Sequence, residues 1–454
     1  MVKVAGILFV PATFASYKQK NRKMPDRSIP PVIHHAVEFD LLLPECKRFS
    51  LDNGVPVLAV DAGVEEVLQI EWVFEAGNAF ENANMVAGAT NHLLKNGTTT
   101  RSAFEINEQI DYYGAYLNRS CYNETAMVSL HTLSKHLPKL LPVVTDIFTH
   151  SNFPQEELNI FVQNSRQRLS VNLRKSDFVA NREMDVILYG KDHPYGKYSS
   201  FESLDALDRD HITDFYNQYY KMGKLAIFVA GKLPADIAEQ LNTAFGHLPL
   251  QGLRPAKVLV EPGSKPVPES RVIRMENDPA GVQGSIRMAM PYANRHHPDF
   301  QKLQMLNNVF GGYFGSRLMS NIREDKGYTY GIQSYIQSHI GQSALVISTE
   351  AGRNVCEAAI KEVYYEMKQL REELIDEEEL LLVRNYMIGS ILGTLDGPFQ
   401  IIGRWKSYYL NGISDGQAYF NHAVENIKKV SAGELLELAN KYLHEDHFYE
   451  MVVV

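Results

Sequence analysis

One short stretch of the sequence holds residues where the chemistry of a zinc hydrolase would lie. The stretch GATNHLLKNG, residues 88–97, contains Gly88, Asn91 and His92. In the H-x-x-E-H pattern two histidines four residues apart share a helix face and bind zinc, and the glutamate acts as general base. Counted back from His92, a glycine takes the place of the first histidine and an asparagine that of the glutamate.

These replacements remove the chemistry. A single imidazole cannot hold zinc, which needs three or four protein ligands. Asparagine is close to a carboxylate in shape but takes up no proton at neutral pH, so Asn91 cannot act as a base. We therefore predict a helix around His92 that keeps the packing of a zinc-motif helix without binding the metal.

A second pair, Arg323 and Tyr330, lies seven residues apart in IREDKGYTYG. A guanidinium and a phenol both donate hydrogen bonds and can stabilise negative charge that develops on an oxygen. An arginine at a helix end and a tyrosine on a strand are also ordinary structural residues, so the pair alone does not decide its role. Tyr328 is two positions before Tyr330 and, on one strand, would share its face.

The elements that must position these residues can be predicted from patterns of hydrophobic residues. Strands are expected at 55–60 and 67–74, where apolar residues cluster or alternate. Ser102 and Gly114 are typical of the start and end of a helix. Further elements of the first half are expected at 116–122, 126–131, 133–148, 155–175 and 226–230.

The second half repeats this order. A strand at 283–290, a helix at 299–310 and paired strands at 328–337 and 343–349 are expected, with a last strand at the C-terminus. Two landmarks recur at one offset: Tyr220 and Tyr442 are 222 positions apart (442 − 220), as are Pro154 and Asp376 (376 − 154). A shared offset indicates duplication of one α+β unit.

A proline-rich segment separates the two halves. Residues 248–270 contain five prolines and two glycines, a composition typical of a linker. We therefore predict an N-terminal extension at 1–23, a first half at 24–250, a linker at 251–270 and a second half at 271–454.

Bulk composition restricts the possible functions. The 454 residues carry a net charge of −9, so the chain lacks the basic surface of a nucleic-acid-binding protein. Its three cysteines are scattered, which excludes a disulfide framework and fits a reducing compartment. The apolar run 4–15 is too short to cross a membrane. We expect a cytoplasmic protein without a membrane span; the alternative is export, with residues 1–23 as a signal peptide.

The order of several motifs resembles the pitrilysin/insulinase-type zinc metallopeptidases, a family that includes the mitochondrial processing peptidases. The matching stretches are the residues around His92 with NGTTTRSAFEINEQIDYYGAYLN after them, HPYGKY, FYNQYYKMGKLAIFVAGKL and VFGGYFGSRLMSNIREDKGYTYGI. Together they cover most of the chain from about Phe49 onward. The resemblance implies an α+β fold of two homologous halves. Each would be a mostly antiparallel sheet packed against helices, and the halves would face each other across a cleft.

The resemblance also implies roles for single residues. The family's third zinc ligand is a glutamate on a helix that should fall within 155–175, but after Glu157 that helix has no acid, and Arg168 stands in the degenerate zinc site. Three of the four expected zinc-site residues are thus absent. In related active peptidases an arginine and a tyrosine spaced as Arg323 and Tyr330 reach across the cleft, hold the substrate backbone and polarise the scissile carbonyl.

These observations favour a non-catalytic, substrate-positioning subunit of a heteromeric zinc peptidase that acts on peptides or unfolded polypeptides. We expect no zinc in this chain and zinc in a homologous partner, although a homodimer is also possible. The alternative is an inactive scaffold or interaction subunit of another complex. An active enzyme with unusual ligands is disfavoured, because the expected ligand positions offer no replacement donors.

Overall fold

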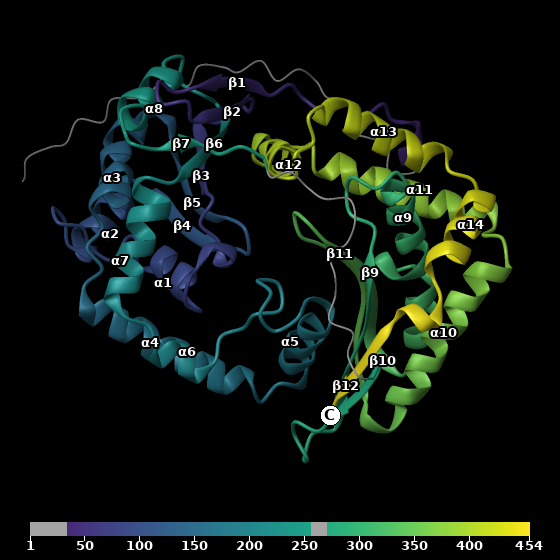
Figure 1. Cartoon of the computed structure of the whole chain (residues 1–454). Coiled ribbons are helices and arrows are strands. Elements are labelled where there is room, and N and C mark those ends of the chain that lie inside the picture. Colours follow the sequence, from purple (N-terminus) through teal and green to yellow (C-terminus); the bar gives the residue numbers. More distant parts are fainter. Residues whose placement is uncertain (1–33, 256–269) are drawn as a thin grey trace, which may run out of the picture.

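The structure, a computed structural model, describes residues 34–255 and 270–454, which form two β-sheets with helices packed against them (Figure 1). The first sheet is built from the N-terminal half of the chain and the second from the C-terminal half. The predicted α+β fold with two similar halves is confirmed.

The first sheet has the strand order β1-β2-β6-β3-β5-β4, and β7 pairs with β6. The pairs β2–β6 and β6–β7 are parallel, and the other pairs are antiparallel. The expected strand 67–74 is observed as β3 with those bounds. The strands are β1 (Lys47–Ser50), β2 (Pro56–Asp61), β3 (Val67–Phe74), β4 (Tyr116–Cys121), β5 (Ala126–Leu133), β6 (Lys224–Gly231) and β7 (Gln251–Gly252).

The second sheet has the order β10-β11-β9-β12-β8, in which only β12–β8 is parallel. Its strands are β8 (Val272–Met275), β9 (Gln283–Tyr292), β10 (Thr329–Ser338), β11 (Ser343–Gly352) and β12 (Tyr449–Val453). This order repeats the β4-β5-β3-β6-β2 part of the first sheet, including the parallel pair at the end.

The helices repeat as well. Helix α4 (Gln155–Asn172) and α11 (Glu377–Gly393) begin 222 residues apart (377 − 155), and so do α5 (Ser176–Tyr189) and α12 (Pro398–Leu410) (398 − 176). The landmarks Pro154 and Asp376 are the residues that immediately precede α4 and α11. The offset read from the sequence is therefore the offset of the duplicated structure.

Each sheet carries helices of its own half on one face. In the first half, Trp72 and Phe74 of β3 pack edge-on against Phe148 of α3, with ring centroids 5.7 and 5.0 Å apart. The remaining helices of this half are α1 (Val86–Leu93), α2 (Ala103–Tyr112), α3 (Leu137–His150), α6 (Phe201–Asp205), α7 (Arg209–Tyr216) and α8 (Ile237–Phe245). Those of the second half are α9 (Phe300–Asn307), α10 (Cys356–Glu372), α13 (Gly416–Lys429) and α14 (Ala432–Tyr442).

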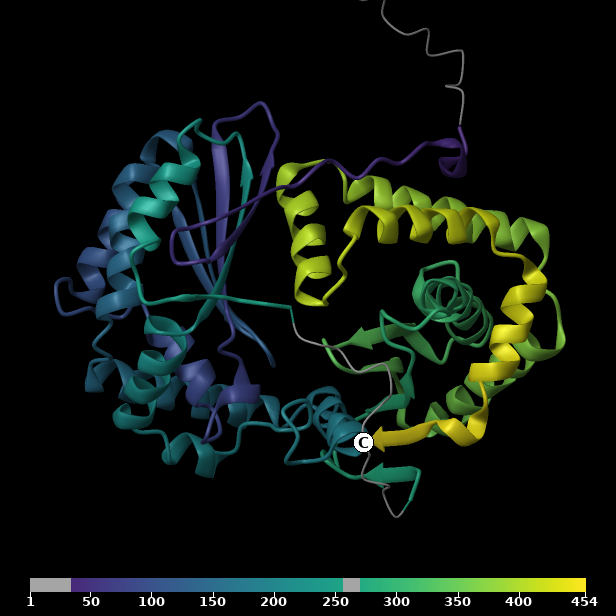
Figure 2. The same cartoon turned by 45° about the horizontal axis from the view of Figure 1, so that its top comes forward.

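The opposite faces are covered by exchanged helices, as Figures 1 and 2 show at the two places where the halves meet. Helix α12 of the second half packs on β2 and β6 of the first sheet through Ile401, Ile402 and Trp405. Helix α5 of the first half packs on β9 and β12 of the second sheet. Because each half buries an apolar sheet face under the other half's helix, the two halves form one hydrophobic unit.

The start of the described chain, in the first half, packs on a helix of the second half. Residues Ala36–Glu38 form a short 3-10 turn that packs on α11, where the Val37 amide donates to Asn385 Oδ1 at 3.1 Å. Strand β7 takes the first two residues of the predicted linker, and residues 256–269 of that linker lie outside the described residues, as does the predicted extension 1–23. None of the helices within residues 34–255 and 270–454 combines the length and hydrophobicity that a membrane span requires.

Candidate functional site

The helix that carries His92 is α1, and a buried carboxylate holds its first turn. Both oxygens of Glu81 accept backbone hydrogen bonds, from Met85 N at 3.3 Å and from Ala87 N at 3.0 Å. Lys197 of the HPYGKY stretch lies 3.2 Å from the same carboxylate, whose side chain is 1% exposed. An acid at a helix N-terminus accepts hydrogen bonds from the free backbone amides and interacts favourably with the helix dipole. Glu81 thereby fixes where α1 begins.

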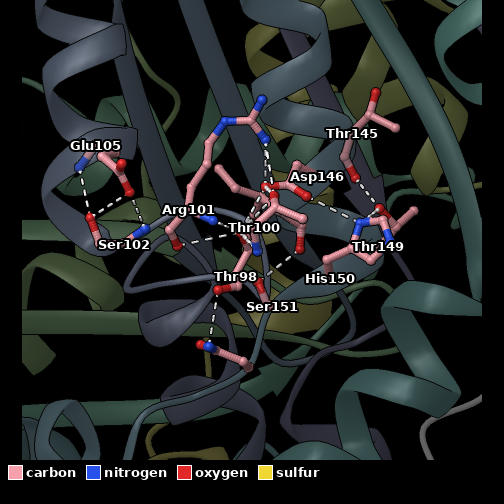
Figure 3. A network of polar contacts seen from close by, with 12 residues as sticks. Thr98, Thr100, Arg101, Ser102, Glu105, Thr145, Asp146, Thr149, His150 and Ser151 are labelled. Atoms are coloured by element: carbon pink, nitrogen blue, oxygen red, sulfur yellow. Dashed lines mark hydrogen bonds and ion pairs between the residues drawn. The ribbon is translucent and has the colours of Figure 1, made fainter.

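The segment after α1 is anchored in the same way (Figure 3). Asp146 of α3 accepts hydrogen bonds from Thr98 Oγ1 at 2.7 Å, Thr100 Oγ1 at 2.8 Å and Arg101 Nη1 at 2.7 Å, and His150 Nδ1 lies 3.1 Å from its other oxygen. Burial opposes ionisation of Asp146, but these hydrogen bonds outweigh it and hold its pKa below the usual range. Carboxylates therefore hold both the start of α1 and the segment that follows the helix.

Asn91, which stands where the motif has its base, points into the core. Its side-chain Nδ2 donates to the hydroxyl of Tyr220 at 3.1 Å and to the Met127 carbonyl at 3.4 Å, and Asn91 is 2% exposed. Tyr220 itself is fully buried. Asn91 therefore serves as a buried hydrogen-bond donor and is not presented to a substrate or a bound water.

His92 lies on the exposed side of α1, and its ring packs against Phe161 of α4 with centroids 5.0 Å apart. The His92 carbonyl accepts a hydrogen bond from Arg119 of β4. Gly88, where the motif has its first histidine, offers no side chain, and a Cβ added there would meet no atom within 4 Å. Position 88 therefore has room for a larger side chain but carries no metal-binding group.

Three cations surround His92. Partial burial of the ring, and after it the charges of Arg119, Arg168 and Lys95, lower the pKa of His92 to about 4. Burial and the nearby Arg119 also lower the pKa of Lys95, and burial lowers that of Arg119 to about 10. The imidazole is thus neutral at pH 7 within a positively charged group.

This arrangement does not fit zinc. Glu157, an acid whose charge raises the pKa of His92, accepts a hydrogen bond from Asn96 Nδ2 at 2.7 Å. Arg168, the residue expected in the degenerate zinc site, contributes a positive charge instead of a carboxylate. Within residues 34–255 and 270–454 no three His, Cys, Asp or Glu side chains come together as a metal site would require. A divalent cation here would meet one imidazole and three like charges.

In the second half the structure brings Arg323 and Tyr330 together. Arg323 lies in the π-helical turn Met319–Asp325, and Tyr330 is the second residue of β10. The Arg323 guanidinium lies 5.7 Å from the ring centroid of Tyr330 and 4.6 Å from that of Phe314. Tyr330 is 93% exposed, so its hydroxyl is open to a ligand.

The expectation that Tyr328 shares the strand face of Tyr330 was wrong. Strand β10 begins at Thr329, and its pairing with β11 is irregular between Thr329 and Ile332, so alternation does not extend back to Tyr328. The Tyr328 side chain packs against the core of the second half, whereas Tyr330 points to solvent.

A hollow of about 380 Å³ lies next to the pair. It is lined by residues 311–314, by Gly331–Gln333 of β10 and by Ser348 and Glu350 of β11. Gly311 approaches β10 so closely that a Cβ would lie 2.6 Å from Ser334 Oγ, so this loop requires glycine. A larger hollow, about 770 Å³, lies between α3 and α8 and is lined by Thr145, Thr149 and His150, away from both predicted sets.

Sequence reasoning therefore identified two sets that the structure keeps in separate halves: Gly88, Asn91, His92 and Arg168 in the first, and Arg323 and Tyr330 in the second. It missed Lys95, Arg119 and Phe314. Arg119 comes from a neighbouring strand, β4. Only the alternation of side chains between the two faces of β4, with Tyr116 on the exposed face, could have predicted that Arg119 lies on the other face, beside α1.

Two sequence profiles of one peptidase family match the chain. The profile described as Insulinase (Peptidase family M16) matches residues 57–184, and the one described as Peptidase M16 inactive domain matches residues 206–387. The chain belongs to the M16 peptidase family.

Its relatives match over nearly the whole chain. An uncharacterized zinc protease of Rickettsia felis is 25% identical over 86% of this chain and 93% of its own length. The mitochondrial-processing peptidase subunit beta of Bos taurus is 23% identical over 90% of this chain and 84% of its own length.

Solved structures agree on the fold. The peptidase M16 inactive domain from Pseudomonas fluorescens superposes with a TM-score of 0.78 at 21% identity, covering 90% of this chain and 98% of that one. A protease from Helicobacter pylori gives a TM-score of 0.78 at 17% identity, covering 91% and 100%. The predicted family and fold are thus confirmed together.

Proposed function

We propose that this M16 family chain is the non-catalytic, substrate-positioning subunit of a heteromeric zinc metallopeptidase that acts on peptides or unfolded polypeptides. The observation that carries the proposal is the contrast between the two halves. Around His92 the zinc donors are missing and the charges of three cations act on the ring, whereas Arg323, Phe314 and Tyr330 form an exposed group in the second half.

In this proposal the chain holds the peptide and a homologous partner supplies zinc and the general base. Arg323 and Tyr330 donate hydrogen bonds to a peptide carbonyl, and the aromatic contact of Phe314 limits the positions that the guanidinium adopts. The nearest carboxylate to Arg323, that of Glu324, is 3.8 Å away, which leaves the guanidinium donors available for a ligand.

The partner is proposed to be a homologous chain with an intact H-x-x-E-H, and the pair to act in the cytoplasm. One relative, the beta subunit from Bos taurus, is by its name part of a multi-subunit peptidase. This likeness supports a heteromeric assembly without identifying the partner.

The test is reconstitution with the homologous subunit from the same organism. We expect Arg323→Gln and Tyr330→Phe each to lower kcat for an unfolded polypeptide on the order of a hundredfold, since each removes a donor to the reacting carbonyl. Tyr365→Phe on α10, where the residue is 51% exposed, is the matched control and should leave turnover unchanged.

Size-exclusion chromatography of each variant pair shows whether assembly is intact. Lost turnover in an intact pair supports the substrate-positioning role. Unchanged turnover in both variants contradicts it and favours the scaffold alternative, in which Arg323 and Tyr330 touch no substrate.

A further inference from the structure

The charged group that replaces the zinc site has chemistry of its own. Lys95, Arg119 and Arg168, hereafter the basic cluster, act on His92 from three segments. They are the turn that follows α1, strand β4, whose Arg119 donates to the His92 carbonyl, and helix α4, whose Phe161 packs on the His92 ring. Within the described parts of the chain, none of the three makes a salt bridge. The charges of Asp111 and Glu157 act on Lys95 and His92. Cations without an ion-pair partner still repel one another, so gathering the three adds no stability to the fold.

Arg119 is the most constrained member. Its Nη1 donates to the His92 carbonyl and, at 3.4 Å, to Asn96 Oδ1, both near the C-terminal end of α1. A cation at a helix C-terminus is stabilised by the helix dipole, which explains one positive charge here. It does not explain Lys95 and Arg168, and the buried Nε of Arg119 has no partner among the described residues.

Glu157 does not neutralise the cluster. Its carboxylate accepts a hydrogen bond from Asn96, and its charge, the last of the causes that act on the pKa of His92, is outweighed by those of the three cations. The group thus retains a positive charge close to a neutral, ring-stacked histidine. A small anion beside the three cations would reduce their mutual repulsion.

We propose that the basic cluster binds a carboxylate of the peptide substrate, so that the former zinc site has become an anion-binding subsite. This inference rests on the proposed function, because the peptide that it anchors is the one that Arg323 and Tyr330 position. The carboxylate comes from an aspartate or glutamate side chain or from the peptide's C-terminus. The net charge of −9 opposes large polyanions, which favours a single carboxylate on a short chain over nucleic acid.

Binding of four short fluorescent peptides to the full-length chain tests the proposal. The peptides share one neutral sequence and differ in a central glutamate or glutamine and in a C-terminal acid or amide. We expect an acidic form to bind on the order of tenfold tighter than the glutamine amide, as one charge-assisted contact in a solvent-exposed site predicts. The arm that shows the preference, side chain or C-terminus, identifies the source of the carboxylate.

Two variants locate the site. Lys95→Gln and Arg168→Gln should each abolish most of the preference for the acidic peptide, and the neutral peptide should bind as before. Arg174→Gln is the matched control, because it removes the same charge from an exposed residue two positions beyond α4. Arg119 is left intact since its substitution would also disturb the end of α1.

Three results overturn the proposal: equal binding of all four peptides, binding of none, or a loss with Arg174→Gln as large as with Arg168→Gln, which would mean unspecific attraction. Arg323→Gln separates the two proposals. It should weaken the acidic and neutral peptides alike and keep the ratio between them. If Arg323→Gln has no effect while the acid preference persists, the basic cluster binds carboxylates and the proposed role of Arg323 is wrong.

Discussion

Replacing Asp146 by asparagine tests whether the carboxylate of Figure 3 fixes the segment that follows α1. The side chain is 7% exposed, and its Oδ2 accepts from Thr98, Thr100 and Arg101 at 2.7 to 2.8 Å. Asparagine keeps the shape but removes the charge, so the three hydrogen bonds to Oδ2 are no longer charge-assisted and Arg101 loses its ion-pair partner. Asp146→Asn should therefore weaken all three contacts.

The size of the effect follows from these contacts. A hydrogen bond to a charged group contributes about 1.5–3 kcal/mol, and the 27% exposure of the Arg101 side chain reduces its share. We expect a net loss of about 2–3 kcal/mol, which lowers the melting temperature of this 454-residue chain, whose two halves form one hydrophobic unit, by roughly 2–4 °C. Differential scanning calorimetry measures the shift, and hydrogen exchange of residues 94–101 shows whether the loss is local.

Asp111→Asn on α2 is the control, because Asp111 is exposed and its substitution should shift the melting temperature by less than about 1 °C. The effect also has a defined pH dependence. The pKa of Asp146 is lowered in the folded protein, so its contribution is present above the unfolded value and is lost as the pH falls through the folded one. The gap between wild type and Asp146→Asn should narrow below about pH 4. A shift no larger than that of Asp111→Asn refutes the reasoning.

Three further results are expected. Burial and the three cations should make the imidazole of His92 titrate near pH 4 in an NMR titration, and Arg168→Gln should raise that pKa. An unchanged pKa in Arg168→Gln would mean that Arg168 does not act on the ring. Tyr220→Phe should destabilise the protein by about 1–2 kcal/mol in thermal unfolding, because Asn91 Nδ2 loses its 3.1 Å acceptor in the core, and a neutral result would contradict that bond. The ring of His339 stacks on Tyr195 of the other half with centroids 3.9 Å apart, and burial lowers the pKa of His339 to about 4. The neutral imidazole therefore stabilises the folded state above the unfolded pKa, and this contribution is lost as the pH falls toward 4. His339→Gln should flatten the drop in melting temperature over that range, and an unchanged slope would contradict the assignment.

The elements and their duplication could be predicted because local signals were strong. Ser102 and Glu105 form the capping box that starts α2, and Gly114, with φ of 59°, follows its end, as the residue types indicate. The boundary at residue 133 was wrong because Ser134–His136 form a 3-10 turn before α3 begins at Leu137. Alternation along β3 could not reveal that its second face is covered by a helix of the other half.

The candidate site was predictable where it lies in one segment. Residues 319–330 bring Arg323 and Tyr330 together through a single turn and the start of a strand, so their spacing sufficed. The basic cluster combines three elements that are distant in sequence, and Lys95, Arg119 and Arg168 have no common pattern. The absence of zinc donors can be predicted from the motif alone. The cations near His92 can be recognised only once the packing of β4 and α4 around α1 is known.

The zinc content of the chain alone and of the reconstituted pair tests the central claim most directly. After equilibration with excess zinc and gel filtration, inductively coupled plasma mass spectrometry should find no bound zinc on the isolated chain. The pair with the H-x-x-E-H subunit should hold about one zinc ion and cleave an unfolded polypeptide. About one tightly bound zinc ion on the isolated chain would contradict the account, because it would mean that the region around His92 binds the metal despite its three cations.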